Sequence, residues 1–116
     1  MKGIIRRKDV AFHGKDWRGR DVYLLRSTIK NHIARFHYDE VLLVDRIKEN
    51  LAAPRVVVEN PGARSEQALY EIPVGGHPYL QVNIKYRAWL RKNLIVSFYG
   101  VDEIPKGRVL WKKPGN

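Results

Sequence analysis

No cysteine occurs among the 116 residues of the sequence. Composition therefore excludes disulfide frameworks, thiolate zinc sites and cysteine nucleophiles. The glycines follow neither the Walker nor the Rossmann spacing, so the sequence implies no nucleotide cofactor. His32 and His37 lie five residues apart on one helical segment, point in different directions and lack a suitably spaced carboxylate. We therefore expect no metal site.

Long apolar runs are also missing. No stretch approaches the roughly 18 consecutive apolar residues that a membrane span requires. Arg6 and Arg7 interrupt the first apolar residues too early for a secretory leader. We therefore expect a cytoplasmic protein that makes no membrane contact. Hydrophobic residues make up 44% of the chain, which excludes global disorder, and the length fits one domain over residues 1–116.

Acidic charge is scarce. The sequence contains 12 Asp and Glu residues and 22 Lys and Arg residues, which gives a formal net charge of +10. This charge favours a polyanionic partner such as nucleic acid. Residues 1–37 carry ten cations and three acids, residues 38–84 carry four and seven, and residues 85–116 carry eight and two. If the two basic ends meet in the fold, they form one cationic face. The alternative, basic charge that serves only solubility, stays open.

Hydrophobic periodicity predicts an α+β domain. Residues 1–26 read as an N-terminal strand or hairpin extension, with strand candidates at 3–12 and 21–26. Residues 27–53 show the spacing of two helices, at 28–37 and 40–51. In residues 54–113, apolar and polar residues alternate with a period of two, which indicates the strands of an antiparallel sheet. We expect two N-terminal helices packed on a four- to five-stranded antiparallel sheet, with the other sheet face partly open.

Two polar side chains flank the apolar stripe of the first helical segment. Ile29, Ile33 and Phe36 form the stripe, and His32 and Arg35 lie on the same side of it. An imidazole that moves a proton beside a guanidinium that holds phosphate charge suits cleavage of a phosphodiester. The alternative is a solvated pair on an ordinary helix flank.

Residues 85–93 alternate four cations with two aromatic rings at the expected tip of a hairpin. Aromatic rings stack on unpaired bases and cations contact phosphates, so this composition is typical of a single-stranded nucleic-acid contact. The alternative is an edge hairpin kept soluble by its charge, with Trp89 in the core. The expected nucleic-acid contacts are His37, Tyr86, Arg87, Trp89, Arg91, Lys92, Tyr99 and Lys106.

Two adjacent expected strands place Asn83, Lys85, Ser97 and Tyr99 on their non-core sides, where these residues form one polar patch. Ser97 lacks the Gly-x-Ser-x-Gly elbow of serine hydrolases, so we expect it to donate a hydrogen bond to phosphate. Together with His32 and Arg35, Ser97 and Lys85 complete the candidate catalytic set.

The order of these parts resembles the phage-barnase-like branch of the barnase, EndoU, colicin and RelE-like ribonuclease superfamily. The resemblance covers residues 21–113 and depends on the helix motif at 27–37, the following strands and Lys106. It implies a metal-independent RNA endonuclease with two helices on a four-stranded antiparallel sheet, found in phage-borne or toxin-like proteins. The family's site residues carry over to His32, Arg35 and His37, and to Ser97 with Tyr99 nearby. Several members have threonine at the Ser97 position.

The leading hypothesis is therefore cleavage of RNA by attack of its own 2′-hydroxyl. His32 serves as general base or acid, and Arg35 and Lys85 hold the phosphate. The expected partners are RNA and an antitoxin or immunity protein. Two alternatives remain: a non-catalytic RNA- or DNA-binding module, and a phage or host regulatory domain that binds protein through the acidic middle of the chain.

Overall fold

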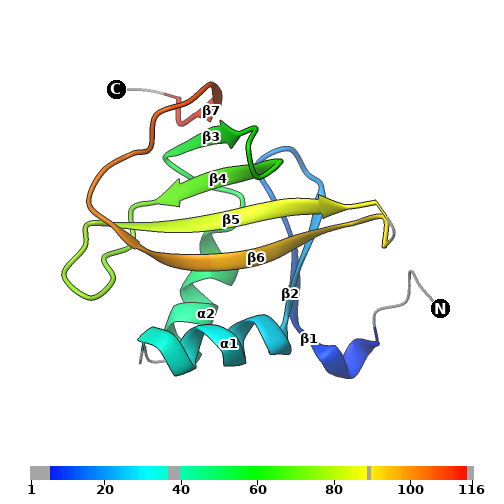
Figure 1. The fold of residues 1–116 in the computed structure, drawn as a ribbon. Helices are drawn as coiled ribbons and strands as arrows, with labels where there is room; N and C mark the ends of the chain where they lie inside the picture. The colour runs from blue at the N-terminus through cyan, green and yellow to red at the C-terminus, as the bar shows by residue number, and fades with distance from the viewer. Residues whose placement is uncertain (1–5, 37–39, 89, 115–116) are drawn as a thin grey trace.

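The computed structural model describes the backbone of residues 6–36, 40–88 and 90–114, and the side chains of these residues except 32–36, 40 and 41. A seven-stranded sheet forms the body of the molecule, with the strand order β1-β2-β6-β5-β4-β3-β7 (Figure 1). The elements are η1 (Arg7–Asp9), β1 (Val10–Lys15), β2 (Asp21–Leu25), α1 (Arg26–Phe36), α2 (Glu40–Asn50), β3 (Val56–Asn60), β4 (Ser65–Tyr70), β5 (Tyr79–Arg87), β6 (Lys92–Val101) and β7 (Val109–Lys112).

The sheet is mixed. β2 runs parallel to β6, with Val22 opposite Asn93 and Tyr23 opposite Leu94, and the other neighbouring strands pair antiparallel. The expected fold, two N-terminal helices on a four- to five-stranded antiparallel sheet, is therefore wrong. The N-terminal hairpin belongs to the sheet and precedes the helices, and β7 adds an edge beside β3. Local periodicity detects strands, but it carries no signal for a short parallel pairing between residues some 70 positions apart.

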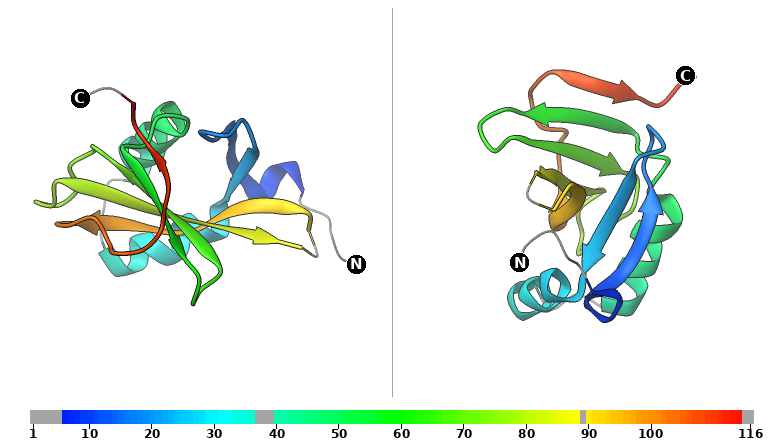
Figure 2. Two further views of the ribbon diagram at one scale, coloured as in Figure 1. Left: turned by 90° about the horizontal axis from the view of Figure 1, so that it is seen from above. Right: turned by 90° about the vertical axis from the view of Figure 1, so that its right-hand side faces the viewer.

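Both helices bury apolar side chains against the same sheet face. α1 contributes Ile29, and α2 contributes Leu43 and Ile47 at a spacing of four, which places these two on one side of the helix. Leu51, directly after α2, continues the same buried stripe. Figure 2 shows α2 beside the β1–β2 hairpin, behind the sheet as Figure 1 draws it. The helix bounds differ from the expected ones by one or two residues.

Strand alternation divides β5 between the two faces of the sheet. Leu80, Val82 and Ile84 enter the main core, whereas Gln81 and Asn83 point to the opposite face. We call this opposite face, which is turned toward the viewer in Figure 1, the open face.

A smaller apolar cluster covers one part of the open face. It consists of Val56, Val58 and Leu69. The connection between β6 and β7 packs against it at Gly107, which has a φ of 152° and where a Cβ atom would lie 2.7 Å from Val58 Cγ1. This close approach requires glycine. Beside this cluster, the open face carries the polar side chains of Gln67, Gln81 and Asn83.

The turn between β1 and β2 is built around a buried carboxylate. The Asp16 side chain is 0% exposed and forms an ion pair of 2.7 Å with Arg20 Nη2. Asp16 Oδ1 also accepts hydrogen bonds from the backbone N–H groups of Arg18 and Arg20. Arg20 extends to Glu66 Oε1 on β4 at 2.6 Å. Burial lowers the pKa of Arg20, but its hydrogen bonds with Glu66 and Asp16 outweigh that effect, so the pKa lies above its usual value.

Replacing Asp16 by alanine is expected to lower the free energy of unfolding by roughly 3–5 kcal/mol, because it leaves two N–H groups and part of a guanidinium without their buried acceptor. Asp102→Ala is the matched control, since this aspartate is 71% exposed in its ion pair with His77 and should cost less than about 1 kcal/mol. Urea unfolding measures both. Equal losses in the two variants would contradict the assigned role of Asp16.

A buried hydroxyl joins the second helix to the sheet. Tyr70 on β4 donates a hydrogen bond of 2.9 Å to the carbonyl oxygen of Leu51, directly after α2. Burial, with a smaller contribution from the charge of Asp16, raises the pKa of Tyr70. Its proton is therefore held more tightly in the folded chain than in the unfolded one.

This shift predicts an alkaline loss of stability. Because the pKa of Tyr70 is higher in the folded chain than in the unfolded one, the protonated hydroxyl stabilises the fold at pH values below the unfolded pKa of about 10. This stabilisation is lost as the pH rises above that value. Between about pH 9 and 11 the wild type should therefore lose more unfolding free energy than Tyr70→Phe, which has no such proton. Tyr86→Phe, at an exposed ring, is the control. If the unfolding free energies of the wild type and Tyr70→Phe fall in parallel as the pH rises, Tyr70 is not the main cause of the alkaline loss of stability.

Candidate nucleic-acid interface

The polar part of the open face contains a hollow of about 200 Å³. We call it the anion hollow. Strands β4, β5 and β6 supply most of its wall, and the β3–β4 turn closes one side. Its lining residues are Asn60, Ala63, Ser65, Gln67, Asn83, Lys85, Arg87, Val96, Ser97 and Tyr99. The lining contains two cations and no carboxylate, so the hollow suits an anion.

Side-chain amides and hydroxyls form a hydrogen-bonded ladder across the floor of this region. Asn83 Nδ2 donates to Ser97 Oγ at 2.7 Å and to the Tyr99 hydroxyl at 3.3 Å. Gln81 Nε2 donates to Asn83 Oδ1 at 2.9 Å and to the Tyr99 hydroxyl at 3.1 Å. Antiparallel pairing sets these contacts, because Asn83 lies opposite Ser97 and Gln81 opposite Tyr99.

The direction of these bonds determines what the ladder offers to a ligand. The hydroxyl oxygens of Ser97 and Tyr99 both accept from amide N–H groups, so each hydroxyl proton remains free to be donated. Both residues are half-buried and line the hollow. The ladder therefore presents two oriented O–H donors, which complement phosphate oxygens.

Like charges gather beside the ladder. Arg87 on β5 lies directly opposite Lys92 on β6, and Lys85 lies two residues before Arg87 on the same face. Like charges opposite one another destabilise a sheet. Within the described part of the chain, none of these three cations forms an ion pair with a carboxylate. An anionic ligand would relieve this repulsion.

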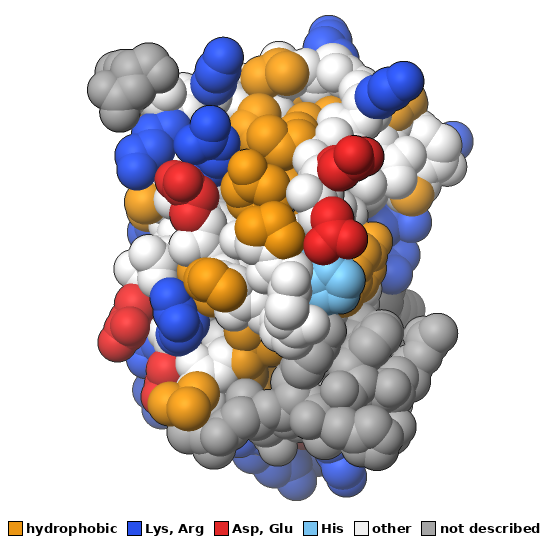
Figure 3. All heavy atoms as spheres, turned by 90° about the vertical axis from the view of Figure 1, so that its left-hand side faces the viewer, with side chains coloured by type: hydrophobic (Ala, Val, Ile, Leu, Met, Phe, Trp, Pro, Cys, Tyr) orange, Lys and Arg blue, Asp and Glu red, His pale blue; other side chains and the backbone are white. Residues whose placement is uncertain are grey.

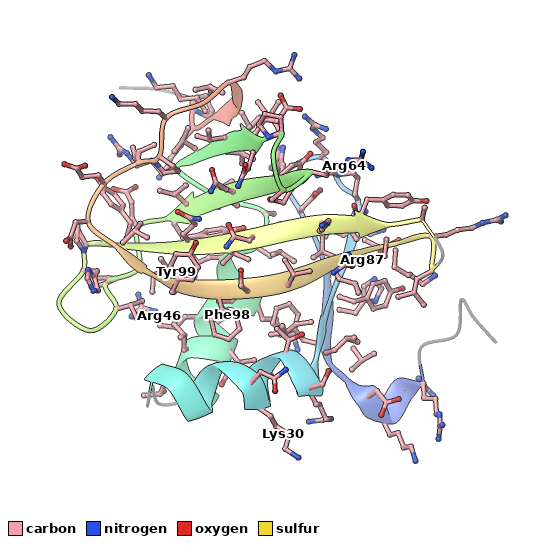
Figure 4. The ribbon with its side chains drawn as sticks, viewed as in Figure 1. Lys30, Arg46, Arg64, Arg87, Phe98 and Tyr99 are labelled. Carbon is pink, nitrogen blue, oxygen red and sulfur yellow. The ribbon has the colours of Figure 1, made fainter. Side chains whose placement is uncertain are left out.

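Two arginines occupy strained turn positions at this end of the sheet. Arg64 in the β3–β4 turn has a φ of 53°, and Arg91 in the β5–β6 turn has a φ of 56°. The left-handed conformation costs a residue other than glycine roughly 1–2 kcal/mol. Figure 4 shows Arg64 and Arg87 near the same end of the sheet, while Tyr99 lies over its other half. Both turns therefore carry an arginine at the expense of backbone strain.

Two expected contacts lie elsewhere. Tyr86 points to the opposite face from Lys85 and Arg87 and is 56% exposed. It lines a second hollow of about 350 Å³ that also contains Glu59 and Glu66, so positive charge there is compensated. Lys106 precedes Gly107, which packs against Val58 and Glu59 of β3, and β4 separates β3 from β5. The structure therefore does not bring Lys106 together with residues 85–92.

The catalytic candidates of the first helix are placed only in part. The backbone of His32 and Arg35 lies in α1, and their side chains fall outside the described residues. His37 and Trp89 lie wholly outside the described residues. α1 contacts β6, the strand that carries Ser97 and Tyr99, and runs alongside it in Figure 1.

Sequence reasoning missed part of the site. Gln67 joins it because β4 pairs with β5, where Gln67 lies opposite Asn83. The pattern Asn60-Pro61-Gly62 marks a turn, but only the pairing shows which strand end it meets. Gln81 extends the ladder and was visible in the alternation of residues 79–86.

The other end of the sheet has a different character. Figure 3 shows that the left-hand side of the molecule carries apolar side chains together with acidic and basic ones. The exposed apolar residues Ile104 and Val109 belong to the β6–β7 connection and β7. There, His77 Nδ1 lies 2.8 Å from Asp102 Oδ1.

Comparisons with known proteins add no assignment: no family model, no curated protein and no solved structure matches the chain. Among the helices of the described segments, none is long and apolar enough to cross a membrane. No group of three or more His, Asp or Glu side chains in those segments is arranged to hold a metal ion.

Proposed function

We propose that this protein binds RNA through the open face and cleaves it by attack of a ribose 2′-hydroxyl on the adjacent phosphodiester. The observation that carries the binding proposal is the anion hollow, where cations without ion-pair partners surround two hydroxyl donors. The net charge of +10 favours a polyanion over a single small anion.

Four residues of the hollow contact the phosphate in this proposal. Lys85 and Arg87 neutralise a phosphate, while Ser97 and Tyr99 donate hydrogen bonds to its oxygens and fix its position. The ladder beneath them keeps both hydroxyls oriented before RNA arrives, so little ordering is required on binding. Lys92, opposite Arg87, attracts the neighbouring phosphate.

The cleavage step uses α1. In this proposal His32 accepts the proton of the 2′-hydroxyl as its oxygen attacks phosphorus, and the 5′-oxygen leaves with a proton from the solvent. The products are a 2′,3′-cyclic phosphate and a 5′-hydroxyl. Arg35 and Lys85 hold the charge of the pentacoordinate phosphate. The contact of α1 with β6 and the resemblance of residues 27–37 to the ribonuclease motif support this arrangement.

Arg87→Gln tests binding. It should weaken binding of a single-stranded RNA several-fold and reduce the salt slope of log K by about 0.7, the share of one phosphate contact. It should also raise the unfolding free energy slightly, because it removes the repulsion from Lys92.

Lys30→Gln is the matched control for Arg87→Gln. It removes the same charge on the far side of α1, where Figure 4 shows Lys30 pointing away from the sheet. Fluorescence anisotropy at several salt concentrations measures the affinities. Equal effects of the two variants would mean that only net charge matters and that the open face is not the binding site.

His32→Ala tests cleavage. Incubation of labelled RNA with the wild-type protein in EDTA should yield cyclic-phosphate products, and the variant should lose at least the ~100-fold typical of general acid–base groups. His77→Ala, at the opposite end of the sheet, should cleave normally. Binding without cleavage by the wild type would favour a non-catalytic RNA-binding module. Full activity in His32→Ala would remove His32 from the mechanism.

A further inference from the structure

We propose that the open face continues beyond the anion hollow into a nucleotide subsite on β1 and β2, where an unpaired RNA base stacks on the paired rings of His13 and Tyr23. This inference rests on the proposed RNA binding and extends it, because it defines the substrate as a single-stranded segment several nucleotides long.

The two rings form a preorganised stacking platform. Their centroids are 4.4 Å apart and their planes differ by 3°. His13 Nε2 lies 2.7 Å from Asp21 Oδ1, a contact that fixes the orientation of the imidazole. His13 lies opposite Tyr23 across the β1–β2 ladder, so the pairing of these strands brings the rings together. A base that stacks there meets rings whose positions are already set.

Strand register places this platform on the open face. Tyr23 lies opposite Leu94, and Leu94 lies opposite Lys85, which lines the anion hollow. Side chains of directly opposed residues project from the same face of a sheet. Alternation gives the same result, because Val22 and Leu24 enter the core and Tyr23 between them points away from it.

Cations bridge the platform and the hollow. Lys92 Nζ lies 5.6 Å from the centre of the Tyr23 ring, and Lys92 is paired with Arg87. One carboxylate, Asp21, lies at the platform, and Lys15 at 2.8 Å compensates its charge. Hydrogen bonds from Lys15 and His13 lower the pKa of Asp21, so it remains an anion that orients these groups.

The geometry also sets the length of the ligand. Three strand spacings separate β1 from β5, or about 14 Å at ~4.8 Å per strand. A stacked single strand advances about 3.4 Å per nucleotide, so about four nucleotides span the distance. A dinucleotide can occupy the hollow or the platform but not both. Duplex RNA cannot use the platform, because its bases are stacked within the helix.

Binding of 2′-O-methyl oligouridines, which cannot undergo 2′-hydroxyl attack, tests the subsite. Tyr23→Leu and His13→Ala should each weaken binding of an oligomer of about eight nucleotides by roughly 10-fold. Both variants should leave binding of a dinucleotide in the anion hollow unchanged. His13→Phe retains a stacking ring without the bond to Asp21 and should preserve most of the affinity. His77→Ala, the other histidine bonded to an aspartate, is the control.

The outcomes separate the subsite from the function on which it rests. If the wild type binds the long oligomer tightly and the ring variants bind it equally well, the subsite is refuted and RNA binding stands. If a matched duplex binds as tightly as the single strand, stacking is likewise refuted. If the wild type binds no oligomer at low salt, the proposed function fails and the subsite fails with it.

Discussion

The parallel pairing of β2 with β6 is the constraint on which the arrangement depends. It extends over Val22 with Asn93 and Tyr23 with Leu94. This short contact joins the N-terminal hairpin to the β3–β6 meander and makes one sheet of seven strands. It also places β2, from the basic N-terminal part of the sequence, beside β6, from the basic C-terminal part. Because α1 follows β2 directly, the same pairing positions α1 against β6.

Charge is distributed so that one region stays positive. Among the described residues, six carboxylates form ion pairs and none of the six lines the anion hollow, namely Asp16, Asp21, Glu59, Glu66, Glu71 and Asp102. The hollow itself has no carboxylate in its lining. Arg87 opposite Lys92 and the left-handed Arg64 and Arg91 each destabilise the fold slightly. These unfavourable choices gather at one end of the sheet and support the proposed binding role.

The sequence predicted the patch better than the fold. Alternation along residues 79–86 and 94–99 placed Asn83, Lys85, Ser97 and Tyr99 on one side, and the structure brings them into one hollow because antiparallel neighbours are local in sequence. The mixed sheet escaped prediction, because the partner of β2 lies some 70 residues away and periodicity does not specify partners. The role of Tyr23 escaped for the same reason. Its stacking on His13 depends on hairpin register, which sequence alternation does not supply.

The claim that the open face binds RNA is tested most directly by NMR. Backbone and side-chain amide signals of the protein would be recorded as a short single-stranded RNA with 2′-O-methyl groups is added. The account predicts that the largest shifts fall on the Asn83 side-chain amide and on residues 85, 87, 92 and 97, with small changes along α2. Shifts centred on α2 or on the loop around His77, with the Asn83 amide unmoved, would contradict it.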